Sequence, residues 1–179
     1  ALFGAAGVWA HAVLRASYLR LEAQDRRGCV QRVAELIAAD MDYLQRTTRD
    51  YAQWDDTYRF IQGRNVTFLR ENLAAEYFLN LGLDMVLLVD RQGRLRHQAL
   101  LAGRAEGRTP GQELVNACLR RLPDYLDAGG VRGKTGLIPT QVGPFLVAAH
   151  PIVHSSGRGP VAGTMITGRY LNAEVLRRQ

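Results

Sequence analysis

The sequence predicts an α+β domain, in which one long helix precedes a five-stranded antiparallel sheet with helices packed on it. Residues 15–61 contain no proline and a single glycine, and their apolar residues recur every three or four positions, which is the period of a helix. From residue 84 the pattern changes to short apolar runs separated by turns, which is typical of strands. Five such runs with one helical stretch among them favour a single sheet covered by helices.

The first fourteen residues contain no Lys, Arg, Asp or Glu. As a helix they would span about 21 Å, less than the roughly 30 Å of a bilayer core. We expect residues 1–14 to be the outer end of a transmembrane helix that starts before this sequence. An apolar packing helix within a soluble domain is the alternative.

Residues 15–61 are expected to form the long helix. About 45 residues of helix would extend roughly 68 Å, which exceeds the width of a domain of this size. We therefore expect the helix to lie against a twin in a parallel homodimer, formed mainly by residues 15–48. The apolar stripe for this contact consists of Leu14, Tyr18, Leu21, Val30, Val33, Ile37, Met41 and Leu44.

Residues 62–172 are expected to form the body of the domain, because residues 62–65 break the helical pattern. Thr67 can cap a shorter helix that ends near Tyr77. The predicted strands cover residues 84–89, 94–101, 135–141, 144–153 and 161–169, and a helix near 112–126 lies between the second and third. Asn172 can cap a last helix, and residues 173–179 are expected to begin it and to lead back toward the membrane.

Composition excludes several classes of protein. With 47% hydrophobic residues the chain is not disordered, and 179 residues suit one domain. A net charge of +6 would permit contact with nucleic acid, but the arginines are scattered and no basic patch is interleaved with aromatic residues. We therefore expect no nucleic-acid partner.

The two cysteines, Cys29 and Cys118, are far apart and belong to no Cys-x-x-Cys pair, so no zinc site is expected. Two separate buried thiols are the expected state. An oxidising compartment would allow a disulfide if the helices that carry them touch.

No catalytic constellation stands out. Asp55 and Asp56 are adjacent, so on a helix they point about 100° apart and cannot face one substrate together. His150 and His154 share a strand face but lie about 13 Å apart, too far for one metal ion. We expect no enzymatic activity, no cofactor and no metal.

The stretch DYAQWDDTYRF, residues 50–60, is the most informative in the chain. On a helix, Tyr51, Trp54, Asp55 and Tyr58 would share one face, which places a carboxylate in an aromatic stripe. An ionised Asp withdrawn from water is costly unless it is satisfied. Asp55 is therefore expected to be buried and to have a partner, either backbone N–H groups, an Arg, or a ligand that carries an ammonium group.

This stretch resembles the signature of the fourth class of CHASE domains, the extracytoplasmic sensing modules of bacterial cyclases and histidine kinases. In that family an aromatic-x-x-Trp-Asp-Asp-x-Tyr helix is followed by Asn-containing segments and a strand, and the last strand ends in Gly-Arg-x-Leu. Residues 83–93 and 163–171 are similar to the two strands, and the resemblance covers about residues 30–172. The order of elements resembles the PAS/Cache-like architecture. The positions that match the motif, and that are expected to serve structure, are Asp56, Asn65, Asn72, Gly163, Gly168 and Arg169.

The resemblance implies a ligand-sensing domain on the periplasmic side of a bacterial inner membrane, anchored by flanking helices. The cytoplasmic part would be a cyclic-di-GMP cyclase or phosphodiesterase, or a histidine kinase. The expected ligand is an unidentified small molecule, and an amine would suit the aromatic faces and the carboxylate. Its candidate contacts are Tyr51, Trp54, Asp55 and Tyr58, with His97, His150 and Thr164 added from strand alternation.

Two alternatives stay open. Asp55 can serve structure alone, by accepting backbone N–H bonds that fasten the long helix to the sheet, with Trp54 in the core. The whole domain can also be a non-binding dimerisation or spacer module that holds two helices in register.

Overall fold

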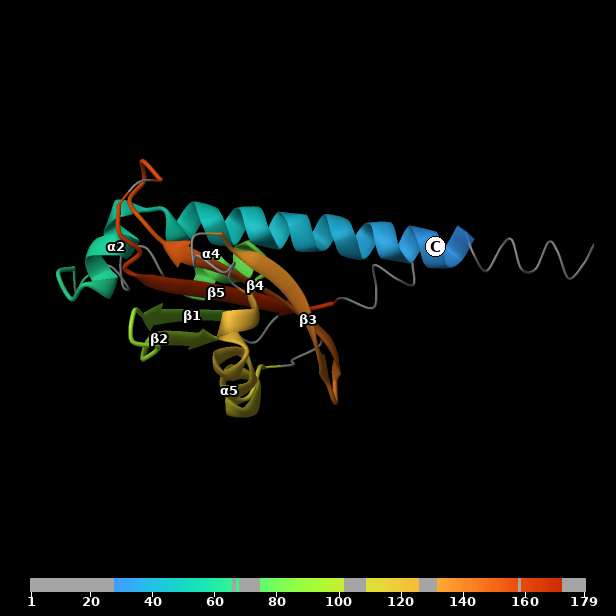
Figure 1. The fold of residues 1–179 in the computed structure, drawn as a ribbon. Helices are drawn as coiled ribbons and strands as arrows, with labels where there is room; N and C mark the ends of the chain where they lie inside the picture. The colour runs from blue at the N-terminus through green and yellow to red at the C-terminus, as the bar shows by residue number, and fades with distance from the viewer. Residues whose placement is uncertain are drawn as a thin grey trace, which may run out of the picture. The chain divides into compact units, whose positions relative to one another are not determined.

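The computed structural model describes residues 28–65, 67, 75–101, 109–125, 132–157 and 159–171. Residues 28–52 are helical, and two short helices follow, α2 (Asp55–Ile61) and α4 (Ala75–Asn80). The strands and remaining helices are β1 (Met85–Asp90), β2 (Leu95–Leu100), α5 (Gln112–Arg120), the 3-10 helix η1 (Leu122–Tyr125), β3 (Lys134–Thr140), β4 (Gly143–Ile152) and β5 (Gly163–Tyr170) (Figure 1). This order confirms the predicted α+β fold. Every strand begins and ends within two residues of its predicted bounds.

Some predictions fall on other residues. The transmembrane end at 1–14, the upstream part of the long helix, Asn72 and the final helix at 173–179 lie outside the described residues. Within the described ranges, no helix is both long and apolar enough to cross a membrane. The same ranges hold no group of three His, Cys, Asp or Glu side chains that could bind a metal ion.

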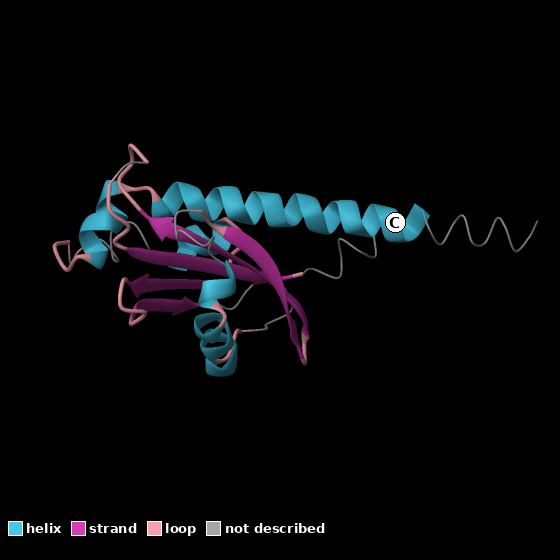
Figure 2. Cartoon of the chain, in the orientation of Figure 1, coloured by secondary structure: helices cyan, strands magenta, loops and turns pink. Residues whose placement is uncertain are grey.

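The five strands form one antiparallel sheet in the order β2-β1-β5-β4-β3 (Figure 2). The last strand of the chain, β5, therefore lies at the centre, between β1 and β4. Its residues are almost all buried, as are those of β1. β5 is thus held on both sides by neighbouring strands.

One face of the sheet carries an apolar core beneath α5. The buried α5 residues Leu114, Val115 and Cys118 pack here. Phe145 and Tyr170 meet edge to face, with ring centroids 4.9 Å apart. Gly168 lies beneath this pair, and a Cβ at that position would collide with the Phe145 ring. The sheet contributes Met85, Leu87, Val89, Ile138, Phe145, Val147, Ala149, Ile166 and Tyr170 to the same cluster.

The helical residues 40–52 cover the opposite face. Leu44 and Thr48 are fully buried against it. Thr48 Oγ1 lies 2.6 Å from Thr167 Oγ1 on β5 and donates to the Leu44 carbonyl at 2.7 Å. Because the Thr48 hydroxyl has a single proton, Thr167 must be the donor between the two threonines. The helix is thus fastened to the central strand by a polar contact inside an otherwise apolar layer.

The sequence had predicted a long helix that runs unbroken to residue 61, but the structure shows a break. It ends at Ala52, and Trp54 is extended, with φ −78° and ψ 137°. The Thr57 hydroxyl donates to the Tyr51 carbonyl at 2.8 Å, in place of a backbone donor of a continuing helix. A new helix, α2, starts at Asp55 and places Ile61 against Gly163 at the start of β5.

One residue of the predicted dimer stripe lies elsewhere than expected. Leu44 was expected to contact a second copy, but it is fully buried in the core of its own domain. Val33 and Ile37 of the same stripe are partly exposed. The cysteines are both free thiols, as predicted, and Cys118 is buried. Cys29 is exposed, so its predicted burial is wrong.

Candidate functional site

The residues of the aromatic and acidic motif lie where the long helix ends and α2 begins. Tyr51, Trp54 and Asp55 do not share one helical face, because the helix break separates Tyr51 from the other two. The Tyr51 and Trp54 rings still lie together, with centroids 4.5 Å apart, and Phe78 of α4 is 5.7 Å from Tyr51. Trp54 is 39% exposed, so it is not the core residue that the structural alternative required.

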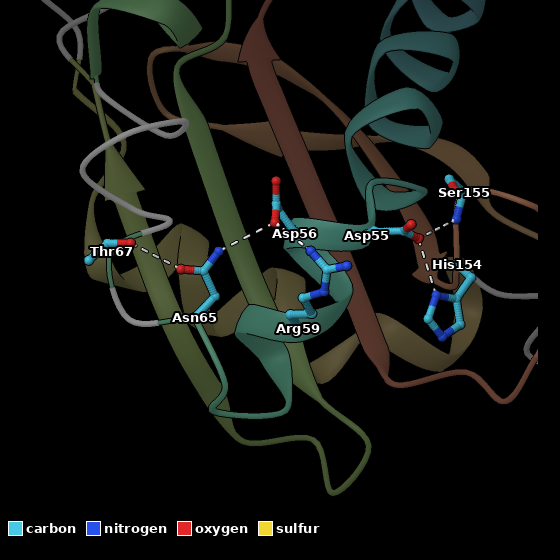
Figure 3. A network of polar contacts seen from close by, with 7 residues as sticks. All are labelled: Asp55, Asp56, Arg59, Asn65, Thr67, His154 and Ser155. Atoms are coloured by element: carbon cyan, nitrogen blue, oxygen red, sulfur yellow. Dashed lines mark hydrogen bonds and ion pairs between the residues drawn. The ribbon is translucent and has the colours of Figure 1, made fainter.

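Asp55 fastens α2 to the loop between β4 and β5. Its Oδ1 accepts the backbone N–H of Ser155 at 3.0 Å and the Nδ1–H of His154 at 3.1 Å (Figure 3). The Ser155 N–H bond, and then the His154 bond, hold the pKa of this carboxyl below its usual range. The predicted hydrogen bonding is confirmed. The predicted burial is wrong, because the side chain is 43% exposed at the molecular surface.

Tyr58 strengthens the same attachment from the buried side of α2. Its ring stacks on His154 with centroids 3.9 Å apart, and its hydroxyl donates to the Pro160 carbonyl at 3.3 Å. Together Asp55 and Tyr58 hold the β4–β5 loop at three residues, His154, Ser155 and Pro160. Nothing in the sequence pattern pointed to these partners, which lie about a hundred residues away.

Asp56 holds a different segment. It accepts Arg59 Nη1 at 3.2 Å and Asn65 Nδ2 at 3.4 Å, and Asn65 Oδ1 in turn accepts the Thr67 hydroxyl at 3.1 Å (Figure 3). The two adjacent aspartates therefore point to different sides of α2, as the helical geometry predicted. We call Asp55, Asp56 and Tyr58 the α2 clamp, because they bind the segments on both sides of this helix.

The other three candidate ligand contacts lie elsewhere. His97 is opposite Leu88 and His150 is opposite Met165, so both histidines are on the face covered by the long helix. These pairs form one row across four strands, which separates the two histidines by about 14 Å. Thr164 pairs with Val89 and therefore faces the α5 side. The structure does not gather the seven predicted residues into one pocket.

His150, which is buried, and His97, which is half-buried, both favour the neutral form. Burial lowers the pKa of His150, whose Nδ1 lies 3.0 Å from the Pro151 carbonyl. Burial also lowers the pKa of His97, and its buried Nε2 has no hydrogen-bond partner.

A second polar cluster, which the sequence pattern had not indicated, lies at the end of β5. Arg169 Nη2 is 2.6 Å from Asp40 Oδ1 on the long helix, and its guanidinium lies over the Tyr43 ring at 5.3 Å. Asp84, just before β1, accepts the backbone N–H of Tyr170 at 2.7 Å. Burial raises the pKa of this carboxyl. Arg169 had been predicted as a structural residue, and these contacts give its role, but Asp40 and Asp84 carried no signal in the pattern.

A groove of about 720 Å³ lies between α5 and the hairpin of β3 and β4. Buried Leu114, Ile138 and Tyr170 line it, and Glu113 and Arg120 contribute charged groups. Its volume falls within the usual range for ligand pockets. None of these residues was a candidate from the sequence.

The chain is similar in sequence to part of a known histidine kinase. The histidine kinase FilI of Methanothrix harundinacea, a methanogenesis regulatory protein, is 27% identical over 133 residues. The match covers 74% of this chain and 15% of FilI, so the chain corresponds to a small part of that relative.

Solved structures show a weaker similarity. The sensory domain of the Campylobacter jejuni chemoreceptor Tlp3 gives a TM-score of 0.49 at 10% identity, over 85% of this chain and 59% of that one. The Tlp3 ligand-binding domain in complex with L-valine gives 0.47 at 10% identity, over 85% and 58% of the two chains.

The CHASE4 domain matches residues 36–178, a range that includes the α2 clamp, the whole sheet and the Arg169 cluster. The chain therefore belongs to the CHASE4 family of sensor domains, as its motif had indicated.

Proposed function

We propose that this domain is the extracytoplasmic, ligand-sensing part of a membrane-bound receptor, on the periplasmic side of the inner membrane. The CHASE4 match over residues 36–178 is the observation that carries the proposal. The relative FilI is a histidine kinase, which supports a kinase as the output module. A cyclic-di-GMP cyclase or phosphodiesterase is the second candidate output.

The connections within the domain support a route for the signal. The long helix is joined to β5 through Thr48 and Thr167 and through Asp40 and Arg169. A ligand that binds one packing of the sheet better than another shifts the balance by its differential affinity. Because both contacts lie on β5, such a shift would act on this central strand.

The α2 end is the first candidate for ligand contact. Asp55 Oδ1 accepts the Ser155 N–H and the His154 ring N–H, and the side chain is 43% exposed, so the carboxylate is within reach of a ligand in solvent. The Tyr51 and Trp54 rings pack on each other just before Asp55 in the chain, and such rings offer the π-faces that a cation prefers. We therefore propose an amine-bearing small molecule here, with Tyr58 supporting the site.

The proposal is tested by ligand-dependent stability. Small molecules released from the purified chain are identified by mass spectrometry and added back during thermal unfolding. A compound that binds only the folded state at a hundred times its dissociation constant stabilises the fold by about 2.7 kcal/mol. Asp55→Asn should weaken an amine, and Asp56→Asn is the matched control. If neither released compounds nor a metabolite panel raise the melting temperature, the non-binding spacer becomes the better reading.

We also propose that the receptor acts as a homodimer through its N-terminal helix, upstream of residue 40. Val33 and Ile37 are partly exposed there, whereas Leu44 is fully buried. Single cysteines at Val33 and Ile37 in the membrane-anchored receptor should crosslink between subunits, and Leu44→Cys should not. Equal crosslinking at all three positions would contradict this interface.

A further inference from the structure

The two edges of the sheet differ in how they are protected. Edge strands present unpaired backbone groups, which proteins blunt with charges and prolines. Exposed Arg94, just before β2, and exposed Arg96 on β2 give this protection. β3 has exposed Lys134 at its start and Pro139 near its end, and between them Leu137 is 40% exposed. Val142 in the adjoining turn is 46% exposed. The β3 edge is therefore apolar around Leu137, between Lys134 and Pro139.

The register of β3 shows which of its backbone groups point away from the sheet. Pro139 pairs with Pro144, whose carbonyl accepts the N–H of Leu171 on the β5 side. The Gly133 carbonyl accepts the side chain of Gln45. Bonded and unbonded pairs alternate in an antiparallel ladder, so Thr135 shares this outward orientation with Leu137 and Pro139.

The free edge can therefore make a short ladder. It offers the N–H and carbonyl groups of Thr135 and Leu137. Pro139 offers only a carbonyl, because proline has no N–H. This missing donor limits an added strand to a few residues.

The groove described above lies beside the same edge. Leu114 and Ala117 of α5 form one side of it, and Ile138 and Pro139 of β3 form the other. Side chains of a strand alternate between the two faces of a sheet. A strand added along β3 would therefore place every second side chain in the groove and the others beside Leu137. Main-chain bonds to an edge with a side-chain pocket next to it form a known mode of peptide recognition.

We propose that the chain binds an extended peptide as a short sixth strand along β3, with alternate apolar side chains in the groove. The inference goes beyond the proposed function, because this ligand would bind at the β3 edge and not at the α2 end. Backbone hydrogen bonds would provide the register, and the apolar groove would select the side chains.

A second copy of the chain fits this edge less well than a free peptide. Self-pairing about Leu137 would set Thr135 opposite the other copy's Pro139, which has no N–H to donate. The groove side of the added strand would then be Gly136, which has no side chain, and Ile138, which is already buried in its own core.

The test selects peptides from a displayed random heptapeptide library on the purified chain. Two substitutions change the number of β3 backbone N–H groups that point away from β4, one lowering it and the other raising it. Neither removes a hydrogen bond between β3 and β4. Leu137→Pro removes a donor and should weaken the selected peptides about fivefold, while Pro139→Ala adds one and should tighten them by a similar factor. Ala117→Leu fills the groove and should abolish enrichment, whereas Asn116→Leu, on the exposed side of α5, should not.

Amide hydrogen exchange reads the same contact without a substitution. The amides of Thr135 and Leu137 should exchange quickly in the free chain and become protected when a selected peptide is added. Those of Gly136 and Ile138 should be protected throughout. Protection that instead grows with protein concentration alone would show a second copy at the edge and overturn the proposal.

Equal enrichment on the wild type and on Leu137→Pro would also overturn it. If a small molecule raises the melting temperature equally in the wild type, Leu137→Pro and Pro139→Ala, the sensing function stands and the peptide inference alone fails.

Discussion

The two ends of the sheet are each fastened by an aspartate, and the two aspartates are held in opposite ways. At the α2 end, Asp55 accepts the Ser155 N–H, is 43% exposed, and has a lowered pKa. At the other end, which we call the exit end because β5 finishes there at Tyr170, Asp84 accepts the Tyr170 N–H and is 4% exposed. Its pKa is raised because of its burial. The bond to a backbone amide is similar in both. Burial is the main cause of the pKa shift at Asp84, whereas the Ser155 and His154 bonds are the main causes at Asp55.

The comparison separates two tasks. The α2 end fixes loops with charged groups that keep their water, so its attachments can be made and broken at low cost. The exit end buries the Asp84 carboxylate beside β5 and places Arg169 near it. We expect the exit end to be the stiffer of the two.

The largest expected effect is at two glycines of β5, one at each end. A Cβ on Gly168 would meet the Phe145 ring, while one on Gly163 would meet the Val89 carbonyl of the neighbouring strand. Each Gly→Ala change should lower the free energy of unfolding by about 2–3 kcal/mol in chemical denaturation. Phe145→Leu should partly rescue Gly168→Ala, because a side chain can be shortened. The same change should not rescue Gly163→Ala, and equal rescue of both would contradict the steric cause.

A smaller effect is expected for the ion pair at the exit end. Arg169→Leu removes the partner of Asp40 and the cation near buried Asp84, and should cost about 1–2 kcal/mol. A double-mutant cycle with Asp40→Ala should give a coupling of about 1 kcal/mol, because both side chains are largely shielded from water. A coupling near zero would mean that Arg169 acts through Tyr43 alone.

The two aspartates should give pH dependences of opposite sign. The folded state raises the pKa of Asp84, so its contribution is fully present below the unfolded pKa of about 3.9 and is lost as the pH rises from there through the folded value. Asp55 has a lowered pKa, so its contribution is present above about pH 4 and is lost as the pH falls further. Stability should be compared between wild type, Asp84→Asn and Asp55→Asn from pH 3 to 7. The same trend in both variants would contradict the assignment.

The smallest effects are expected within the α2 clamp. Asp55→Ala should speed amide exchange at Ser155 and loosen the β4–β5 loop, because a backbone N–H loses its acceptor. Asp56→Ala should leave Ser155 unchanged and affect only the segment around Asn65, whose bond to Asp56 is long at 3.4 Å. Nuclear magnetic resonance exchange rates distinguish the two. A change at Ser155 in both variants would show that α2 itself had unfolded.

The sequence predicted where the five strands lie along the chain, because alternation and turns are local signals. It also predicted that Asp55 and Asp56 diverge, since that follows from helical geometry. The break after Ala52 was missed because it depends on the Thr57 hydroxyl reaching the Tyr51 carbonyl.

The candidate site was harder to predict than the fold. Alternation places His97, His150 and Thr164 within their own strands, but pairing between strands sets which face each one occupies. The partners of Asp55 come from a loop about a hundred residues away, and no local pattern encodes that contact.

The two thiols provide a means of observing local opening of the core without any substitution. Burial raises the pKa of Cys118 to about 12, so at neutral pH it stays protonated and inert toward maleimides. Cys29 is exposed on the incoming helix and should take up one label per chain. A fluorophore can therefore be attached at a single place without mutagenesis. Any slow second labelling would then time the opening of the α5 core in the intact domain.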